Sequence, residues 1–225
     1  MRPGGAAEVA KQQRAIETRS QIINAAAQVF AASGYVSTSL NEIVRVADVT
    51  QGALYFHFGS KSELAAEVIR LQHAKSIGAG ARHLDEQDSG IAGMVLLSGA
   101  LANQILNDPV VRAGLRLSTE AVAEMAEAAQ LPYEEWASTA KRFLEKARAL
   151  GETRADLDLD AAAEVVSSLF TGTQFVSVAT TGGSDLLERL ARMWKVVLPG
   201  MVSDPEHWAI LRASELIETT ALEAA

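Results

Sequence analysis

Residues 49–64 read Val49-Thr50-Gln51-Gly52-Ala53-Leu54-Tyr55-Phe56-His57-Phe58-Gly59-Ser60-Lys61-Ser62-Glu63-Leu64. Thr50 is a residue type that caps helix N-termini, and Gly59 is a helix breaker. Together they predict a short helix that ends near Phe56. Ser60 and Glu63 have the spacing of a capping box, so a further helix is expected to start at about residue 61.

A second short helix is predicted directly upstream of this one. Ser39 and Glu42 also have capping-box spacing, and they place a helix over residues 40–47. Only Asp48 and Val49 separate it from the helix at residue 50. Two short helices joined by so tight a turn have the proportions of a helix-turn-helix.

A longer helix precedes this pair and is expected to brace it. Ile16, Ile23 and Phe30 recur at a spacing of seven and form one apolar stripe over about residues 13–33. Gly34 then stands where a left-handed residue commonly ends a helix. Leu54, Phe56 and Phe58 are expected to lie in the core between the three helices.

The rest of the chain also has helical periodicity, so an all-α fold is predicted. We expect helices at about 61–83, 91–107, 109–128, 133–150, 159–180, 184–198 and 205–221, with a break at Leu131-Pro132. The predicted organisation is a disordered N-terminal arm over 1–11, a helix-turn-helix DNA-binding domain over 12–60, and a ligand-binding and dimerisation domain over 61–225.

The net negative charge alone argues against a nucleic-acid partner, but the charge is unevenly distributed along the chain. The 225 residues are 48% hydrophobic and include no cysteine, which excludes disulfides and thiolate metal sites. Residues 1–61 carry six basic and four acidic side chains, whereas the remainder is strongly acidic, for a net charge of −8 overall. No stretch reads as a signal peptide or membrane span, so a cytoplasmic protein is expected.

The block over about residues 12–66 closely resembles the TetR-type transcriptional repressors. The resemblance rests on the 49–64 stretch together with Thr18-Arg19, Ala25-Ala26, Phe30, Gly34-Tyr35, Thr38-Ser39-Leu40 and Glu42-Ile43. The sequence from Gly52 to Phe58, together with Trp136 further along the chain, is most similar to that of the γ-butyrolactone autoregulator receptors of actinomycetes. The resemblance implies a homodimeric repressor that binds a palindromic DNA operator and is released by a small lactone-type signalling molecule.

The first turn of the predicted recognition helix suits entry into a DNA groove. Small or hydrogen-bonding residues are needed there, and Thr50, Gln51 and Gly52 meet that need. Gln51 is the candidate for base readout, with adenine as its natural partner. Tyr55 is expected at a thymine methyl or a phosphate, although it could instead pack on the first helix, and Thr50 could act only as a cap.

Phosphate contacts are expected around this helix. The family pattern assigns them to His57 and Lys61, and Thr38 and Ser39 are further candidates. Two positions depart from the family pattern. Asp48 stands where glycine is usual, and aspartate tolerates the left-handed conformation of a tight turn. Gln51 stands where lysine or arginine is common, which predicts a shifted base preference or a weaker salt dependence of DNA binding.

The later helices are expected to supply a dimer interface and a ligand pocket. Residues 159–180 and 184–198 are apolar enough to pair across a two-fold axis as a four-helix bundle. Trp136 is the leading ligand-binding candidate because its indole N–H could donate to a lactone carbonyl. Gln72 and Thr171 are weaker ligand-binding candidates, and packing is the alternative for all three side chains.

Other functions remain as alternatives to a lactone receptor. A TetR-type repressor for another apolar small molecule, such as an antibiotic, a precursor or a fatty-acid derivative, would differ only in its pocket. An enzyme or a passive helical scaffold is the remaining alternative. It has no support in the motifs, because the four histidines lack metal-binding spacing and no nucleophile or phosphate-binding motif is present. No metal and no cofactor are expected.

Overall fold

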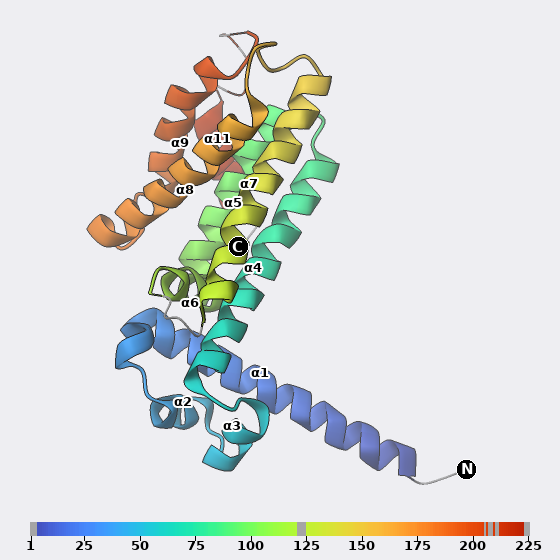
Figure 1. Cartoon of the computed structure of the whole chain (residues 1–225), viewed down its shortest axis with the longest axis vertical. Helices are drawn as coiled ribbons and strands as arrows, with labels where there is room; N and C mark the ends of the chain where they lie inside the picture. The colour runs from blue at the N-terminus through green and yellow to red at the C-terminus, as the bar shows by residue number, and fades with distance from the viewer. Residues whose placement is uncertain (1–3, 121–124, 205, 207–208, 210–211, 223–225) are drawn as a thin grey trace. The chain divides into compact units, whose positions relative to one another are not determined.

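The protein is all-α, as the sequence predicts. The computed structural model describes residues 4–120, 125–204, 206, 209 and 212–222 (Figure 1). Within that part of the chain the elements are α1 (Gly4–Ser37), α2 (Leu40–Ala47), α3 (Gln51–His57), α4 (Lys61–Glu86), α5 (Gly90–Asn107), α6 (Pro109–Thr119), α7 (Ala126–Ala149), α8 (Leu159–Thr181), α9 (Leu186–Val197), η2 (Leu198–Gly200) and α11 (Ala213–Leu222). The one β interaction among the described residues is an isolated bridge between Thr153 and Val202.

The chain forms two compact units that interleave along the sequence. The first contains the described residues up to His73 and those between Pro109 and Gln130, and the second contains the rest. The division expected after residue 60 therefore differs from the observed one: α6 joins the first unit, and α4 contributes to both. Leu117 of α6 is buried in the same core as Phe30 of α1, and this shared core explains the difference.

The first unit is the predicted helix-turn-helix with its brace. Helices α2 and α3 lie against the same part of α1 (Figure 1), and Ile43 and Leu54 are fully buried between them. Both predicted caps form, because Ser39 Oγ accepts from the Glu42 amide and Thr50 Oγ1 accepts from the Ala53 amide. These caps satisfy amides that the first helical turns leave open.

The turn between α2 and α3 confirms the expectation at Asp48. Its φ is 52° and its ψ is 46°, the left-handed conformation that aspartate tolerates better than most residues. Its backbone N–H donates to the Val44 carbonyl and closes α2. The two helices are therefore linked at a fixed angle without a glycine.

The second unit is built around buried side chains of α5, α7 and α9. Trp194 is 1% exposed and donates its Nε1–H to Ser98 Oγ at 2.8 Å. Gly90 starts α5 so close to α7 that a Cβ on it would lie 2.4 Å from the Phe143 carbonyl oxygen. A larger residue there would push the two helices apart.

Three predicted boundaries differ from the structure. The break at Pro132 is wrong, because α7 runs through this residue. The preceding helix ends at Thr119 rather than at residue 128. Helix α1 begins at Gly4, so residues 4–11 are helical where a disordered arm was expected, and the alanines of this stretch favour a helix. Residues 1–3 of the expected arm lie outside the described residues.

Helix α5 is apolar and long enough to span a membrane by length and composition alone, but 72% of that stretch is buried inside the protein. This burial is what the central helix of a folded core shows. The apolar composition of α5 is therefore accounted for by packing within the second unit.

Candidate functional site

Helix α3 buries one side and presents the other to solvent. Leu54 is 0% exposed and Phe58, which follows the helix, is 2% exposed, so these residues anchor it to the core as predicted. Gln51 and Gly52 are exposed, and Tyr55 is 51% exposed. The structure therefore brings three of the residues expected to read DNA to one open face.

Gly52 meets no neighbour that would require a glycine. The nearest atom to a Cβ placed on it would be Thr50 Oγ1, at 3.9 Å. The small residue is thus not demanded by packing within the chain, as it would be in a crowded helix contact. Its position suits close approach by a molecule outside the chain.

The hydroxyls of Thr50 and Ser39 combine a cap with an outward-facing donor. Each oxygen accepts a backbone hydrogen bond, at 3.1 Å for Thr50 and 3.2 Å for Ser39. Accepting leaves the hydroxyl hydrogen to donate. Both residues are exposed, so capping and phosphate contact are compatible at each of them.

Asn41 of α2 is a neighbour of the recognition face that the sequence did not suggest. Its Oδ1 accepts from Gln51 Nε2 at 3.5 Å. An amide nitrogen has two hydrogens, so Gln51 retains one donor and its oxygen acceptor for a base edge. The contact orients the Gln51 amide from the preceding helix.

Phe56 is a correction to the sequence analysis, which placed it in the core. Its side chain is 80% exposed and its ring meets His57 edge-on at 5.0 Å between ring centres. A seven-residue helix can bury only one narrow face, and Leu54 occupies it. The signal that could have revealed this is the 100° rotation per residue, which places Phe56 well away from Leu54.

Two of the expected phosphate contacts are engaged inside the first unit. Thr38 is 3% exposed and its hydroxyl donates to the Gly34 carbonyl, so this side chain packs within the first unit. Lys61 Nζ donates to the carbonyls of Tyr35 at 2.8 Å and Thr38 at 2.9 Å. These bonds stabilise a cation in the first turn of α4. His57 is half-buried.

Arg19 of α1 fixes the start of α4 in the same unit. Its guanidinium bonds Glu67 at 2.6 Å and lies 5.1 Å from the centre of the Phe58 ring. Burial raises the pKa of Glu67, but hydrogen bonds from Arg19 and Arg70 outweigh it and hold the pKa below its ordinary value. The charged pair therefore persists at neutral pH.

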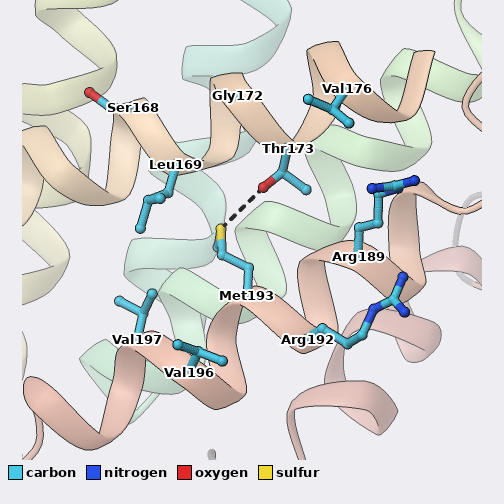
Figure 2. Close-up of a pocket in the computed structure, with 10 residues that line it drawn as sticks. All are labelled: Ser168, Leu169, Gly172, Thr173, Val176, Arg189, Arg192, Met193, Val196 and Val197. Carbon is cyan, nitrogen blue, oxygen red and sulfur yellow. Dashed lines mark hydrogen bonds between the residues drawn. The ribbon is translucent and has the colours of Figure 1, made fainter. Parts of the chain in front are cut away.

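An apolar groove of 790 Å³ lies between α8 and α9 of the second unit (Figure 2). Leu169, Val176, Met193, Val196 and Val197 line it, with Arg189 and Arg192 at its edge. Val196 is 80% exposed. Within the 184–198 stretch that was expected to pair across the interface, the leucines at 186, 190 and 198 are instead buried in the core of the unit.

A smaller groove of 480 Å³ lies between α7 and α8, lined by Tyr133, Glu164, Ser167 and Thr171 among others. Thr171 donates its hydroxyl to the Ser167 carbonyl at 3.0 Å. Trp136 is half-buried and meets the Tyr133 ring edge-on at 5.2 Å between centres. Trp136 and Thr171 thus belong to adjoining parts of the second unit.

Gln72 does not join them in that unit. It is fully buried in the first unit, where its Cβ packs on Gly114 of α6. A Cβ on Gly114 would lie 2.4 Å from that atom, so the contact is a close helix crossing. Packing, the alternative weighed for Gln72, is what the structure supports.

Comparison with known proteins identifies the family. Residues 22–68 match the model described as bacterial regulatory proteins, tetR family. Residues 89–203 match the model of the tetracyclin repressor-like C-terminal domain. The chain belongs to the TetR family of transcriptional regulators. TetR-family regulators are DNA-binding proteins rather than enzymes.

Several relatives of this TetR-family regulator are receptors. It is 35% identical to the A-factor receptor protein of Streptomyces griseus over 86% of this chain and 67% of the relative. A γ-butyrolactone receptor structure, an ArpA-like protein, has a TM-score of 0.73 and 32% identity, covering 94% of this chain and 99% of the other. CprB from Streptomyces coelicolor, solved with its biological operator sequence, has a TM-score of 0.73 and 34% identity, covering 93% and 99%.

Proposed function

We propose that this protein is a cytoplasmic homodimeric repressor that binds a palindromic operator through α3 and is released by a small lactone-type molecule. The observation that carries the DNA-binding part is the division of α3 between a buried Leu54 and an exposed face containing Gln51, Gly52 and Tyr55. A helix with such a face fits the major groove, which is about 12 Å wide. Ser39, Thr50 and His57 supply phosphate contacts around it, and Phe56 adds an apolar contact to sugar or thymine methyl groups.

The α8–α9 groove supports the homodimer. Exposed apolar side chains on two neighbouring helices are unusual on a monomer surface and typical of an interface between subunits. Pairing α8 and α9 of two copies makes a four-helix bundle around these residues. A dimer also presents two recognition helices, which operator sites with half-sites one helical turn (about 34–36 Å) apart require.

The relatives support a lactone as the effector. The A-factor receptor and the γ-butyrolactone receptor align with this chain over most of its length, including the second unit. Trp136 contributes an aromatic ring beside Tyr133, and burial raises the pKa of Tyr133. A lactone is an uncharged ring with one carbonyl acceptor, and an aromatic, largely apolar site suits a ligand of this kind.

Effector binding is proposed to change the separation of the two recognition helices. A shift of a few ångström would remove the match to two successive grooves and lower operator affinity. The coupling is reciprocal, so operator DNA must weaken lactone binding by the same factor.

A regulator of another apolar ligand is less well supported. Other transcriptional regulators among the relatives match over much shorter stretches, for example 63 residues at 44% identity for AcrR of Shigella flexneri. A match of that length cannot include the whole C-terminal region at 89–203. These relatives therefore support DNA binding and say little about the effector.

The test is a selection followed by a titration. The protein is used to select duplexes from a random library, and we expect an inverted repeat with half-sites about one turn apart. Adding a γ-butyrolactone with an aliphatic side chain should release the protein from the selected duplex. The affinity of the protein for this lactone should be lower when that duplex is present. Selection of no sequence would contradict the repressor, and equal lactone affinity with and without DNA would contradict the release mechanism.

A further inference from the structure

The C-terminal part of α1 is hydrogen-bonded by the guanidinium of Arg116 from α6. Gly34 has a φ of 75°, outside the helical range, and α1 is kinked there. The last carbonyls before such a break lack partners within the helix. Arg116 supplies them, because its Nη1 donates to the carbonyl oxygens of Ala31 at 3.0 Å and Ala32 at 3.1 Å.

Glu120 binds the other side of the same break. Its Oε2 accepts from the Tyr35 backbone N–H at 2.7 Å, and its Oε1 accepts from Arg116 Nε at 2.8 Å. Burial raises the pKa of Glu120, but the bonds from Arg116 and Tyr35 outweigh it and hold the pKa below its ordinary value. The two side chains therefore hold both sides of Gly34 as a charged pair.

Gly34 leaves just enough room for this pair. A Cβ at this residue would lie 2.6 Å from Glu120 Oε2 and 2.8 Å from Arg116 Nη2. Lys61 holds the far end of the same turn through the Tyr35 and Thr38 carbonyls. The backbone from residue 31 to residue 38 is thus fixed by side chains of α4 and α6, and α2 starts two residues later.

We propose that Arg116 and Glu120 are positioning residues for operator binding. They hold the α1–α2 turn so that α2 and α3 are presented to DNA at a fixed angle to α1, without touching the DNA themselves. The inference rests on the proposed operator binding. The core of the unit is formed by other side chains, among them Phe30, Ile43 and Leu54, which are fully buried. Losing the pair therefore loosens the turn and leaves the core folded.

The experiment compares Glu120→Ala with Glu127→Ala, which removes an exposed carboxylate from the same unit. The probes are a duplex selected from a random library by the wild-type protein and a scrambled duplex of equal length and composition. Affinities are measured over a range of salt concentrations, and hydrogen exchange follows the Tyr35 amide. Arg116→Met and the double variant complete a mutant cycle.

We expect Glu120→Ala to weaken binding of the selected duplex by about tenfold, the scale set by losing a charge-assisted hydrogen bond. Binding of the scrambled duplex and the slope of affinity against salt should not change, and the Tyr35 amide should exchange faster. The double variant should be no weaker than Glu120→Ala alone. Glu120→Gln, which keeps an acceptor for the Tyr35 amide, should recover part of the loss.

Three results would overturn the inference. One is an unchanged preference for the selected duplex in a folded Glu120→Ala protein. Another is an equal loss for both duplexes. The third is a lower salt slope in Arg116→Met, which would make that side chain a phosphate contact. If the wild-type protein selects no duplex, it is the proposed function that fails, and the hydrogen-exchange result still reports whether the pair holds the turn.

Discussion

Two phenylalanines separated by one residue have opposite environments, and this contrast distinguishes binding from packing at the residue scale. Phe56 is 80% exposed, whereas Phe58 is 2% exposed. We expect Phe56→Ala to weaken operator binding while leaving the melting temperature unchanged, because its ring contributes little to the core. Phe58→Ala is the matched control and should cost about 3–5 kcal/mol of stability. Equal loss of melting temperature in both variants would show that Phe56 packs inside the protein.

The sequence predicted the local roles of single residues well where the backbone sets them. Ser39 and Thr50 cap helices, and Asp48 adopts the left-handed conformation, as expected. Roles that depend on distant neighbours could not be derived in this way. Lys61 bonds carbonyls 26 and 23 residues earlier in the chain, and no spacing in the sequence reports that contact.

Asp185 joins two helices at the element scale, and its charge makes the junction sensitive to acid. It accepts from Ser177 and Thr181 of α8 and from Arg189 of α9. The Ser177 hydrogen bond contributes most to a pKa lowered to about 2. The carboxylate therefore adds stability at neutral pH that is lost as the pH falls from about 4 toward 2. We expect Asp185→Asn to lower the urea midpoint at pH 7 and to reduce the further decrease on acidification.

Glu188→Gln is the control for this prediction, because it removes an exposed carboxylate from the same helix. It should leave the urea midpoint at pH 7 unchanged. An Asp185→Asn protein with the same midpoint as the wild type at both pH values would show that the junction does not depend on the charge.

At one helix boundary, tertiary packing overrides the structure that the local sequence pattern predicts. Proline usually ends a helix because it lacks an N–H and crowds the preceding turn, and the predicted break at Pro132 followed that rule. Helix α7 nevertheless continues through it, and Pro132 is buried. Burial of the surrounding turns compensates for the lost hydrogen bond, which is a property of the folded unit rather than of the local sequence.

Assembly is the property that belongs to the whole molecule, and the α8–α9 groove allows it to be tested. Val196 is 80% exposed in the groove, so Val196→Glu should leave the folded subunit intact. We expect this variant to be a monomer by sedimentation velocity and to lose operator affinity. Val36→Glu changes an equally exposed valine in the first unit and should remain a dimer. A dimeric Val196→Glu protein would contradict the proposed interface.

Which helices belong together was the least predictable property of the chain. The all-α class, the helix-turn-helix and the apolar character of α8 and α9 follow from local patterns. The place of α6 does not, because its amphipathic stripe is equally compatible with any apolar surface. Its tertiary contacts assign it to the first unit, among them those of Arg116 and Leu117 with α1 and that of Gly114 with Gln72 of α4.

The placement of α6 has a consequence for engineering hybrid regulators. Consider a chimera that joins residues 1–73 of this chain to the ligand-binding domain of another regulator. The chimera would lack the α6 of this chain and would contain instead the corresponding helix of the other regulator, which packs on a different α1. The chimera would lack the Arg116 guanidinium and the Glu120 carboxylate, which bind the backbone on either side of Gly34 in α1. It would also expose apolar surface around Phe30. Transplanting residues 109–120 together with the N-terminal segment should give the hybrid a far better prospect of recognising its target.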